Sequence, residues 1–307
     1  MPATLPATAA AAVFTGHGHP FELVDYPIPV PGAGEILVKI ACATICGSDV
    51  HTWHGRRIEP TPCVLGHEAV GTIIGFGDGV ARVDLRGDPL STGDRVTWTL
   101  AASCGECFFC KAGLPQKCES LFKYGHAAIR PGHEFTGGFA QYCLLAPGTG
   151  VIRVPAGLAD AVVAPANCAV ATVAAALRVG GPVTGAVVAV IGCGVLGIIA
   201  CAMARAMGAA EVIACDVAAS RGAIARRFGA VHFASPDDLN GVCLGQSDGR
   251  GADLAIELSG SAQGVATAIA ALRVGGTAVI AGTVAPTSPV ALDPQMLIRR
   301  MLTIKGL

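Results

Sequence analysis

An uncharged stretch from Ala186 to Ala204 constrains the fold of this chain more than any other feature. By length and apolar character it is long enough to cross a membrane. A Gly-x-Gly-x-x-Gly pattern at Gly192, Gly194 and Gly197 interrupts it, however, after one apolar run and before another. A strand, a tight glycine turn and a helix are typical of a dinucleotide-binding unit, whose helix N-terminus meets a pyrophosphate. We therefore predict a buried strand, turn and helix here, and no membrane span.

Residues 169–307 alternate short apolar runs with helical patterns around this stretch. The predicted strands are the six runs AVVAVI, EVIACD, VHFA, DLAIEL, TAVIAG and LTIKG. The predicted helices are GVLGIIACAMARAMGA, SRGAIARRFGA and ATAIAALRV. Residues 235–251 are polar and Gly-rich, which is typical of a surface connection. Strand–helix alternation predicts a doubly wound parallel sheet, and six strands complete a dinucleotide-binding one.

The second predicted strand ends at Asp216, nineteen residues after Gly197. A carboxylate in this position binds a ribose 2′-hydroxyl and repels a 2′-phosphate, so we predict NAD rather than NADP. The alternatives are that Asp216 only caps a helix, and that Arg221 accepts a 2′-phosphate. The predicted cofactor residues are Gly192, Gly194, Val195, Leu196, Gly197, Asp216 and Arg221.

Residues 1–168 have a different sequence pattern, in which Gly, Pro and Asp separate short apolar runs. These runs are EILVKI, AVGTIIGFG, DRVTWTL, AQYCLLA and GVIRVP. Their spacing predicts a β-rich domain. The Ala-rich N-terminus lacks the basic region of a signal peptide, and we interpret it as a low-complexity tract. We expect a cytoplasmic protein with two domains, residues 1–168 and 169–307.

Charge and cysteine content narrow the classes of function. Lys and Arg number 21 against 22 Asp and Glu, so there is no basic surplus to neutralise a nucleic-acid backbone. The 13 cysteines stand in a chain of 307 residues, whereas disulfide frameworks are typical of short secreted domains. Metal-binding or catalytic thiols are therefore the better interpretation.

Four cysteines lie close together in the segment CGECFFCKAGLPQKC, at Cys104, Cys107, Cys110 and Cys118. Four thiolates can surround one tetrahedral ion and leave no open position, which is typical of structural zinc. The alternatives are free thiols and an iron–sulfur cluster. Ferredoxin motifs continue with a Cys-Pro after three residues, whereas seven residues precede the fourth Cys here. We predict a structural zinc site.

A second set of candidate ligands is dispersed along the chain. Cys46 follows an apolar run, His67 comes 21 residues later within Gly-His-Glu, and Cys168 lies in PANCAV. Cys, His and Cys without a fourth protein ligand is the pattern of a catalytic zinc, whose open position takes water or substrate. Singly, each has a simpler explanation, since a buried Cys can be a small core residue and a His can merely be hydrogen-bonded. The combination favours metal.

With its glycine turn, its four-cysteine loop and its dispersed Cys–His–Cys set, the sequence resembles the zinc-dependent alcohol dehydrogenases of the medium-chain dehydrogenase/reductase superfamily. The resemblance runs from about Leu23 to the end and includes GEILVKIACATICGSDVH, GHEAVGTI, GDRV, the four-cysteine loop, GGFAQY and the cofactor turn. It implies a GroES-like domain that binds two zinc ions, a Rossmann domain that binds NAD, and a homodimer or homotetramer. Family members end with a segment that returns to the first domain. Because this chain stops with its sixth predicted strand, we expect C-terminal residues to be missing.

The resemblance also implies roles for individual residues. Cys46, His67 and Cys168 would hold the catalytic zinc, with Glu68 beside it. Asp49 would accept a hydrogen bond from the second ring nitrogen of His67 and so orient that ligand.

Ser48 and His51 match the proton relay of the family. Zinc would lower the pKa of the bound alcohol, the proton would pass from Ser48 through the cofactor ribose to His51, and hydride would go to the nicotinamide. The alternative for His51 is an exposed loop histidine.

The resemblance implies that the substrate is an alcohol, or the matching aldehyde or ketone. Trp53 is expected to line its pocket, with Arg56 and Arg57 at the rim, where they would suit an anionic tail. A solvated basic turn is the alternative. The segment GLPQKCESLFKYGH resembles a subgroup associated with phosphonate metabolism, so a phosphonate-linked substrate is one hypothesis. A zinc-free reductase of the same superfamily would lack the cysteine loop, and a non-enzymatic zinc- and nucleotide-binding relative is the alternative of a different class.

Overall fold

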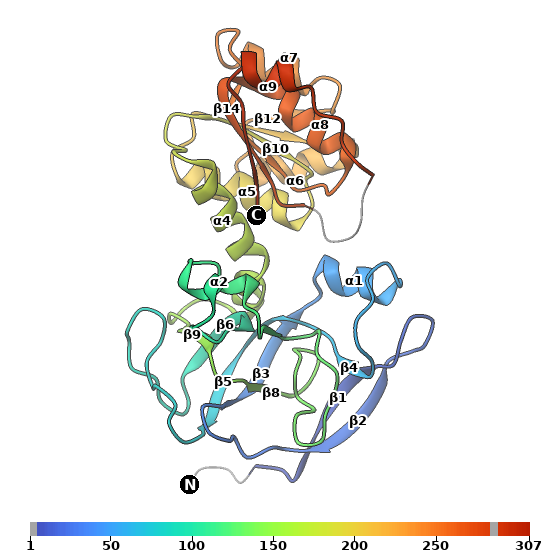
Figure 1. Ribbon diagram of the computed structural model, residues 1–307, viewed down its shortest axis with the longest axis vertical. Helices are drawn as coiled ribbons and strands as arrows, with labels where there is room; N and C mark the ends of the chain where they lie inside the picture. Colours follow the sequence, from blue (N-terminus) through green and yellow to red (C-terminus); the bar gives the residue numbers. More distant parts are fainter. Residues whose placement is uncertain (1–4, 283–287) are drawn as a thin grey trace. The chain divides into compact units, whose positions relative to one another are not determined.

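The computed structural model describes residues 5–282 and 288–307, which form two compact units, Met1–Cys168 and Ala169–Leu307 (Figure 1). The strands of the first unit are β1 (Thr8–Phe14), β2 (Glu22–Pro27), β3 (Ile36–Thr44), β4 (Cys63–Val64), β5 (Glu68–Phe76), β6 (Arg95–Ala102), β7 (Phe122–Lys123), β8 (Tyr142–Leu145) and β9 (Thr149–Arg153). They pair antiparallel in two sheets, one with the order β2-β1-β4 and one with the order β7-β6-β5-β3-β8, in which β9 also pairs with β6. The first unit is therefore β-rich, as predicted.

Short helical segments connect these strands. They are α1 (Gly47–Trp53), α2 (Phe108–Lys111), η1 (Pro115–Lys117), α3 (Asp160–Val163) and η2 (Ala164–Asn167). Most of them lie next to a candidate metal ligand, so the sheets supply a rigid base and the short helices carry the functional side chains.

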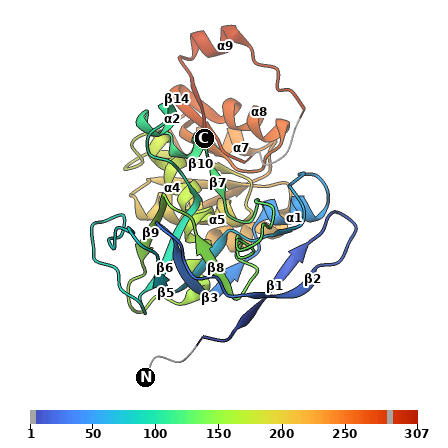
Figure 2. The same cartoon turned by 60° about the horizontal axis from the view of Figure 1, so that its bottom comes forward.

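The Ala-rich N-terminus, for which composition indicated no element, forms a strand: residues 8–14 are β1, which runs beside β2 (Figure 2). Its side chains alternate in burial, and Ala9 and Ala11 pack in one cluster with Leu37 and Phe135. Alanine is depleted in strands in general, so local composition did not indicate a strand. Tertiary packing decides its structure, because small side chains fit beneath the large ones of the neighbouring elements.

The second unit holds one parallel sheet with the order β12-β11-β10-β13-β14-β15. Its strands are β10 (Val187–Ile191), β11 (Glu211–Cys215), β12 (His232–Ala234), β13 (Ala252–Glu257), β14 (Leu272–Ile280) and β15 (Thr303–Gly306). Its helices are α4 (Ala169–Gly180), α5 (Val195–Ala206), η3 (Ala219–Arg221), α6 (Gly222–Arg227), α7 (Leu239–Gly245), α8 (Ala262–Ala271) and α9 (Pro294–Arg299). The order 3-2-1-4-5-6 is that of a complete dinucleotide-binding sheet, which confirms the predicted fold class.

Strand β10 explains the uncharged stretch. Val188 and Val190 pack in the cluster that includes α4 and α5, whereas Val187 and Ile191 pack in the cluster that includes α7 and α8. A strand that helices cover on both faces needs apolar side chains on both faces. Its sequence is therefore a continuous run of apolar residues. The predicted strand, turn and helix are confirmed between β10 and α5.

Two predictions in this unit were wrong in detail. Residues 235–251 are more than a surface connection, because α7 forms there and buries Leu239 and Cys243. The helix predicted through ATAIAALRV ends at Ala271, and Leu272 begins β14. In both places apolar residues next to the sheet take the structure that buries them best.

Within the described residues, no single helix is long and apolar enough to cross a membrane. One pair of consecutive helical segments, bent by 53° between them, is long and apolar enough when both are counted together. These segments are Asp160–Asn167 and Ala169–Gly180.

Candidate metal and cofactor sites

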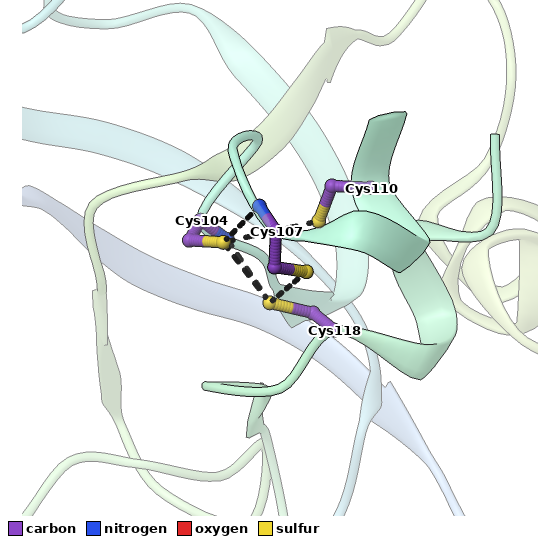
Figure 3. A group of neighbouring side chains, drawn as sticks. All are labelled: Cys104, Cys107, Cys110 and Cys118. Carbon is purple, nitrogen blue, oxygen red and sulfur yellow. Dashed lines mark hydrogen bonds between the residues drawn. The ribbon is translucent and has the colours of Figure 1, made fainter. Parts of the chain in front are cut away.

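The four-cysteine loop folds into a closed set of sulfur atoms (Figure 3). The Cys104 Sγ lies 4.0 Å from that of Cys110 and 3.5 Å from that of Cys118, and Cys107 Sγ lies 3.9 Å from Cys118 Sγ. A tetrahedral ion with Zn–S bonds of about 2.3 Å separates its sulfur ligands by about 3.8 Å. The loop therefore fits a zinc ion with no open position.

Backbone groups of the loop also point at these sulfur atoms. The N–H groups of Glu106 and Cys107 donate to Cys104 Sγ at 3.4 Å each, and the Cys104 N–H donates to Cys118 Sγ at 3.3 Å. The last of these contacts lowers the pKa of Cys118 to about 6. Gly105, with φ of 76°, makes the left-handed turn that brings the N–H groups into position. Backbone hydrogen bonds also lower the pKa of Cys107, whereas burial and the neighbouring thiols raise the pKa of Cys110 to about 12. The loop therefore favours the metal-binding thiolate at two of its four cysteines.

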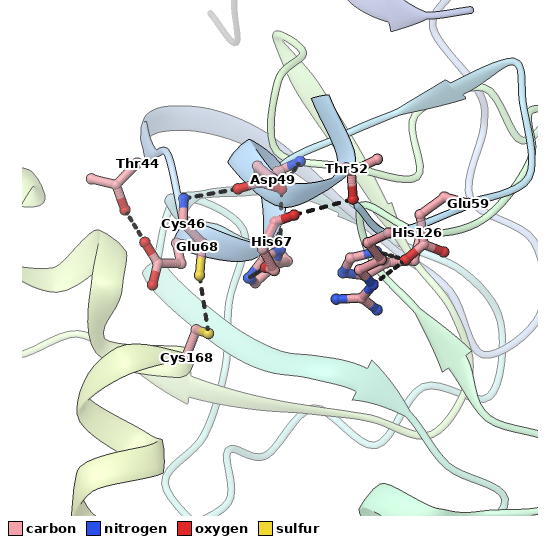
Figure 4. Close-up of polar contacts among 12 residues, drawn as sticks. Thr44, Cys46, Asp49, Thr52, Glu59, His67, Glu68, His126 and Cys168 are labelled. Carbon is pink, nitrogen blue, oxygen red and sulfur yellow. Dashed lines mark hydrogen bonds and ion pairs between the residues drawn. The ribbon is translucent and has the colours of Figure 1, made fainter. Parts of the chain in front are cut away.

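The dispersed ligands also come together (Figure 4). Cys46 stands at the N-terminus of α1, His67 directly before β5, and Cys168 directly after η2. The Sγ atoms of Cys46 and Cys168 are 3.9 Å apart, and the three ligand atoms lie within 4.8 Å of one another. These donor types and separations fit a zinc ion with one position left open.

Asp49 ties two of these ligands to one helix. Its Oδ2 accepts the Cys46 N–H at 2.8 Å, and its Oδ1 accepts the Gly66 N–H at 3.3 Å and lies 3.5 Å from His67 Nδ1. Burial lowers the pKa of His67, but Asp49 and Cys46 outweigh it and raise the pKa to about 9. Because Nδ1 faces Asp49, Nε2 is the ring nitrogen available to a metal.

The thiols of Cys46 and Cys168 affect each other's pKa, and Glu68 affects that of Cys168. Glu68 is buried, and its Oε2 accepts a hydrogen bond from Thr44 Oγ1 at 2.7 Å. Hydrogen bonding from Cys168 lowers the pKa of Cys46 to about 3, and the same contact, burial and the charge of Glu68 raise the pKa of Cys168. Cys46 is therefore the first of the two to become a thiolate.

Ser48 and His51 lie on α1, three residues apart and so on neighbouring positions of one helix face. Ser48 Oγ is 3.4 Å from His67 Nε2. His51 Nδ1 is buried and has no hydrogen-bond partner among the described residues. The alternative of an exposed loop histidine is wrong, because α1 includes His51 and half buries it.

Asn167 is a residue of this region that the sequence analysis missed. Its Nδ2 donates to the backbone oxygens of His67 at 2.8 Å and Trp98 at 2.9 Å. It precedes Cys168 directly and so fixes the segment that carries this ligand against β5 and β6. The only signal was its position beside Cys168, and no spacing rule singles out such a residue.

The predicted substrate residues lie outside the metal set. The ring of Trp53 stacks on Phe21 with centroids 5.2 Å apart and an interplanar angle of 6°. Arg56 is exposed, and Arg57 Nε is paired with Glu59 Oε1 at 2.5 Å. Two adjacent free arginines, as the anionic-tail hypothesis requires, are therefore not present.

In the second unit, a pocket of about 520 Å³ opens at the carboxyl ends of the strands. Four predicted cofactor residues line it, namely Gly192, Gly194, Asp216 and Arg221. Ser259, Ser261 and Gln263 also line it and were not predicted, because they follow β13, far from the glycine turn in sequence.

The remaining predicted cofactor residues build the turn rather than the pocket wall. Val195 and Leu196 begin α5, and a Cβ on Gly197 would come within 1.9 Å of the Gly192 oxygen. Asp216 accepts the N–H groups of Cys193 at 2.7 Å and Ala218 at 2.8 Å. Glycine is required where helix and turn approach so closely, and the result is the phosphate-binding geometry expected at a helix N-terminus.

Comparison with known proteins identifies the family of both units. Residues 32–156 match the model of the alcohol dehydrogenase GroES-like domain, and residues 195–307 match that of the zinc-binding dehydrogenases. An L-threonine 3-dehydrogenase of Bacillus subtilis is 34% identical over 297 residues, which are 93% of this chain and 79% of the relative.

Solved structures give the same result. An alcohol dehydrogenase of Thermotoga maritima is similar with a TM-score of 0.90 and 30% identity, over 98% of this chain and 85% of that one. A putative zinc-binding dehydrogenase of Sinorhizobium meliloti, bound to NADP, has a TM-score of 0.85 and 28% identity over 98% of this chain and 84% of that one. The donor sets and the glycine-turn pocket fit zinc and NAD(P). The chain therefore belongs to the zinc-dependent dehydrogenases of the medium-chain dehydrogenase/reductase superfamily.

Proposed function

We propose that this chain oxidises an alcohol, or reduces the matching aldehyde or ketone, with NAD(H) and a zinc ion held by Cys46, His67 and Cys168. The observation that carries the proposal is the ligand set itself. Three thiol and imidazole groups lie within 4.8 Å of one another, and no fourth Cys, His, Asp or Glu belongs to the group in the described part of the chain. An open position is what a catalytic zinc needs, whereas the four-cysteine loop serves as the structural site.

A zinc ion in this set would supply a Lewis acid that lowers the pKa of an alcohol hydroxyl. Asp49 keeps His67 in the tautomer whose Nε2 faces the metal position. Ser48 Oγ is 3.4 Å from that nitrogen, which puts the hydroxyl within reach of a proton leaving the alcohol. His51 would then take the proton onward, a role that its buried Nδ1, without a hydrogen-bond partner among the described residues, supports.

For the cofactor, we propose NAD rather than NADP. Asp216 lines the pocket with its carboxylate fixed by two backbone N–H groups, so its negative charge would oppose a 2′-phosphate. Arg221 lines the same pocket, which gives NADP as the alternative. Gly192, Gly194, Val195, Leu196 and Gly197 would form the pyrophosphate-binding turn.

A second candidate substrate class comes from the relatives, since eight of them, between 29% and 34% identical, are named L-threonine 3-dehydrogenase. A 2-amino-3-hydroxy acid is therefore the first specific substrate to test. The phosphonate-linked substrate has no support in these names, and Arg57 is already paired with Glu59. A homodimer or homotetramer stays a prediction.

The test is metal analysis followed by turnover of an alcohol panel that contains L-threonine, a simple aliphatic alcohol and a polyol, each with NAD⁺ and NADP⁺. We expect two zinc ions per chain and NAD-dependent turnover of at least one alcohol. Two zinc ions with cofactor binding but no turnover of any alcohol would support the non-enzymatic alternative. A single zinc ion in the four-cysteine loop would overturn the assignment of the dispersed ligands.

A further inference from the structure

The first unit contains a cavity whose lining does not include the three metal ligands. Its volume is about 670 Å³, within the usual range for small-molecule sites. Residues of β7 and the turn after it form one side, and residues at the end of β8 form another. Leu121, Phe122 and Leu144 give it apolar walls. Neither of the proposed zinc sites nor the cofactor pocket accounts for it.

The charges on its lining are all of one sign. Lys123 and Arg130 line it, and no Asp or Glu belongs to the lining. No side-chain hydrogen bond or ion pair links either cation to another described residue. Two acids outside the lining face its histidines: Glu35 Oε1 lies 3.4 Å from His133 Nε2, and Glu59 Oε1 lies 2.9 Å from His126 Nδ1. Glu59 acts on Lys123 through its charge, but neither cation makes a direct ion pair with a described residue, so the lining favours a negatively charged ligand.

Two buried polar side chains in the lining also lack a partner. Thr136 is 3% exposed, and its Oγ1 has no hydrogen bond to any described residue. His126 is 8% exposed, and its Nε2 likewise has none, although its Nδ1 faces Glu59. A buried hydroxyl without a partner is costly, and in native structures it normally has a ligand or a water molecule beside it.

We propose that this pocket binds the carboxylate or phosphoryl group of a small organic anion. Lys123 and Arg130 supply the opposite charge, Thr136 Oγ1 donates a hydrogen bond to an anionic oxygen, and the apolar walls contact the organic part. Arg56 and Arg57 do not line the pocket, although Arg57 pairs with Glu59, which also faces the lining residue His126.

The pocket is also close to the metal set. His126 lines it, and the centroid of its ring lies 5.3 Å from that of the metal ligand His67. The same anionic chemistry can therefore come from two sources, a substituent on the alcohol substrate or a separate anion. Only the first of these rests on the proposed dehydrogenase function.

Binding is tested directly by calorimetry on the zinc-loaded full chain at constant ionic strength, with benzoate, phenyl phosphate and the neutral benzamide as probes. We expect at least one of the two anions to bind, and benzamide to bind at least tenfold more weakly. Lys123→Gln and Arg130→Gln should each weaken the binding of the anion by about tenfold, and Thr136→Val should weaken it by a few-fold. These losses are typical for hydrogen bonds to charged and neutral groups.

The matched control is Lys39→Gln, which removes one positive charge from an exposed position of β3 in the same unit. It should leave the affinity unchanged. Equal affinity for benzoate and benzamide, or an equal loss in the Lys39 and Arg130 variants, would overturn the proposal. Because Arg130 is exposed, its variant decides the matter even if Lys123→Gln fails to fold.

Kinetics then separates the two sources. If the anion is part of the substrate, the same variants lose about tenfold in kcat/KM for a carboxylate-bearing alcohol and nothing for a neutral one. If it is a separate molecule, kcat/KM is unchanged and benzoate still binds at saturating alcohol. Absence of turnover with every alcohol would refute the proposed function alone, because the binding measurement requires no turnover.

Discussion

The two candidate metal sites of the first unit use the same chemistry but are built in opposite ways. The closed set lies within one loop, where Cys104 and Cys118 are 14 residues apart and backbone N–H groups of the loop itself point at the sulfur atoms. The open set joins three segments, and 122 residues separate Cys46 from Cys168. A hydrogen bond that Asp49 accepts from Cys46 and one that Asn167 donates to the His67 backbone hold it together. The comparison indicates that the closed site depends on its own loop, whereas the open site depends on the surrounding sheets.

The sharpest way to separate the two sites is Cys46→Ser. It should reduce turnover by about a thousandfold or more, because the Lewis-acid contribution of a metal stabilises the transition state by several kcal/mol. Zinc content should fall from two ions per chain to one, with NAD binding unchanged. The control is Cys42→Ser, which changes a half-buried thiol of β3 that belongs to neither set. Loss of cofactor binding in the Cys46 variant would contradict the assignment.

The reverse experiment is Cys107→Ser in the closed set. Removing one of four thiolates should release that zinc ion and lower the free energy of unfolding by about 3 kcal/mol or more, since metal-binding energy in such a site is folding energy. Thermal unfolding with and without a chelator measures the effect. Phe108→Ala, at an exposed position of the same short helix, should have little effect. If the Cys107 variant kept both zinc ions, the site would not be closed.

Asp49→Asn tests how the open site is supported. Asparagine keeps the shape but loses the charge that faces His67 Nδ1, and changes of this kind typically cost about 10- to 100-fold in metal affinity or activity. Competition with a chelator should show a lower affinity for zinc at the open set and an unchanged affinity in the four-cysteine loop. Asp25→Asn, on the exposed part of β2, is the matched control. An equal loss of zinc affinity at both sites would mean that the two sites are not independent.

The smallest effect is expected for Asn167→Ala. It removes two hydrogen bonds to backbone oxygens and should lower the free energy of unfolding by about 1–3 kcal/mol. Zinc affinity at the open set should also fall, because Cys168 follows Asn167 directly. Denaturant unfolding and zinc competition provide the two readouts, with the exposed Asn240→Ala as control. A loss of stability without any change in zinc affinity would make Asn167 a purely structural residue.

Much of the fold was predictable because its signals are local. Alternation of strand and helix patterns indicated the parallel sheet, and the glycine turn located its first strand and helix. The errors have one cause. Strand β1 and helix α7 form from segments whose composition favours other structures, and burial of Ala9, Ala11, Leu239 and Cys243 outweighs that preference.

By itself, the sequence determined the donor chemistry: four clustered thiols, a dispersed Cys–His–Cys set and a glycine turn followed by Asp216. Short spacing brings the four thiols and the glycine turn together, because the chain between their members is too short to separate them. For the dispersed set, the sequence indicated only the donor types, and the fold brought Cys46 and Cys168 to 3.9 Å across 122 residues of chain. Only the tertiary structure decided what lies around them. Asn167, the pairing of Arg57 with Glu59 and the pocket lined by Lys123 and Arg130 depend on contacts between distant segments. Such contacts arise from the packing of whole sheets, which no local pattern in the chain encodes.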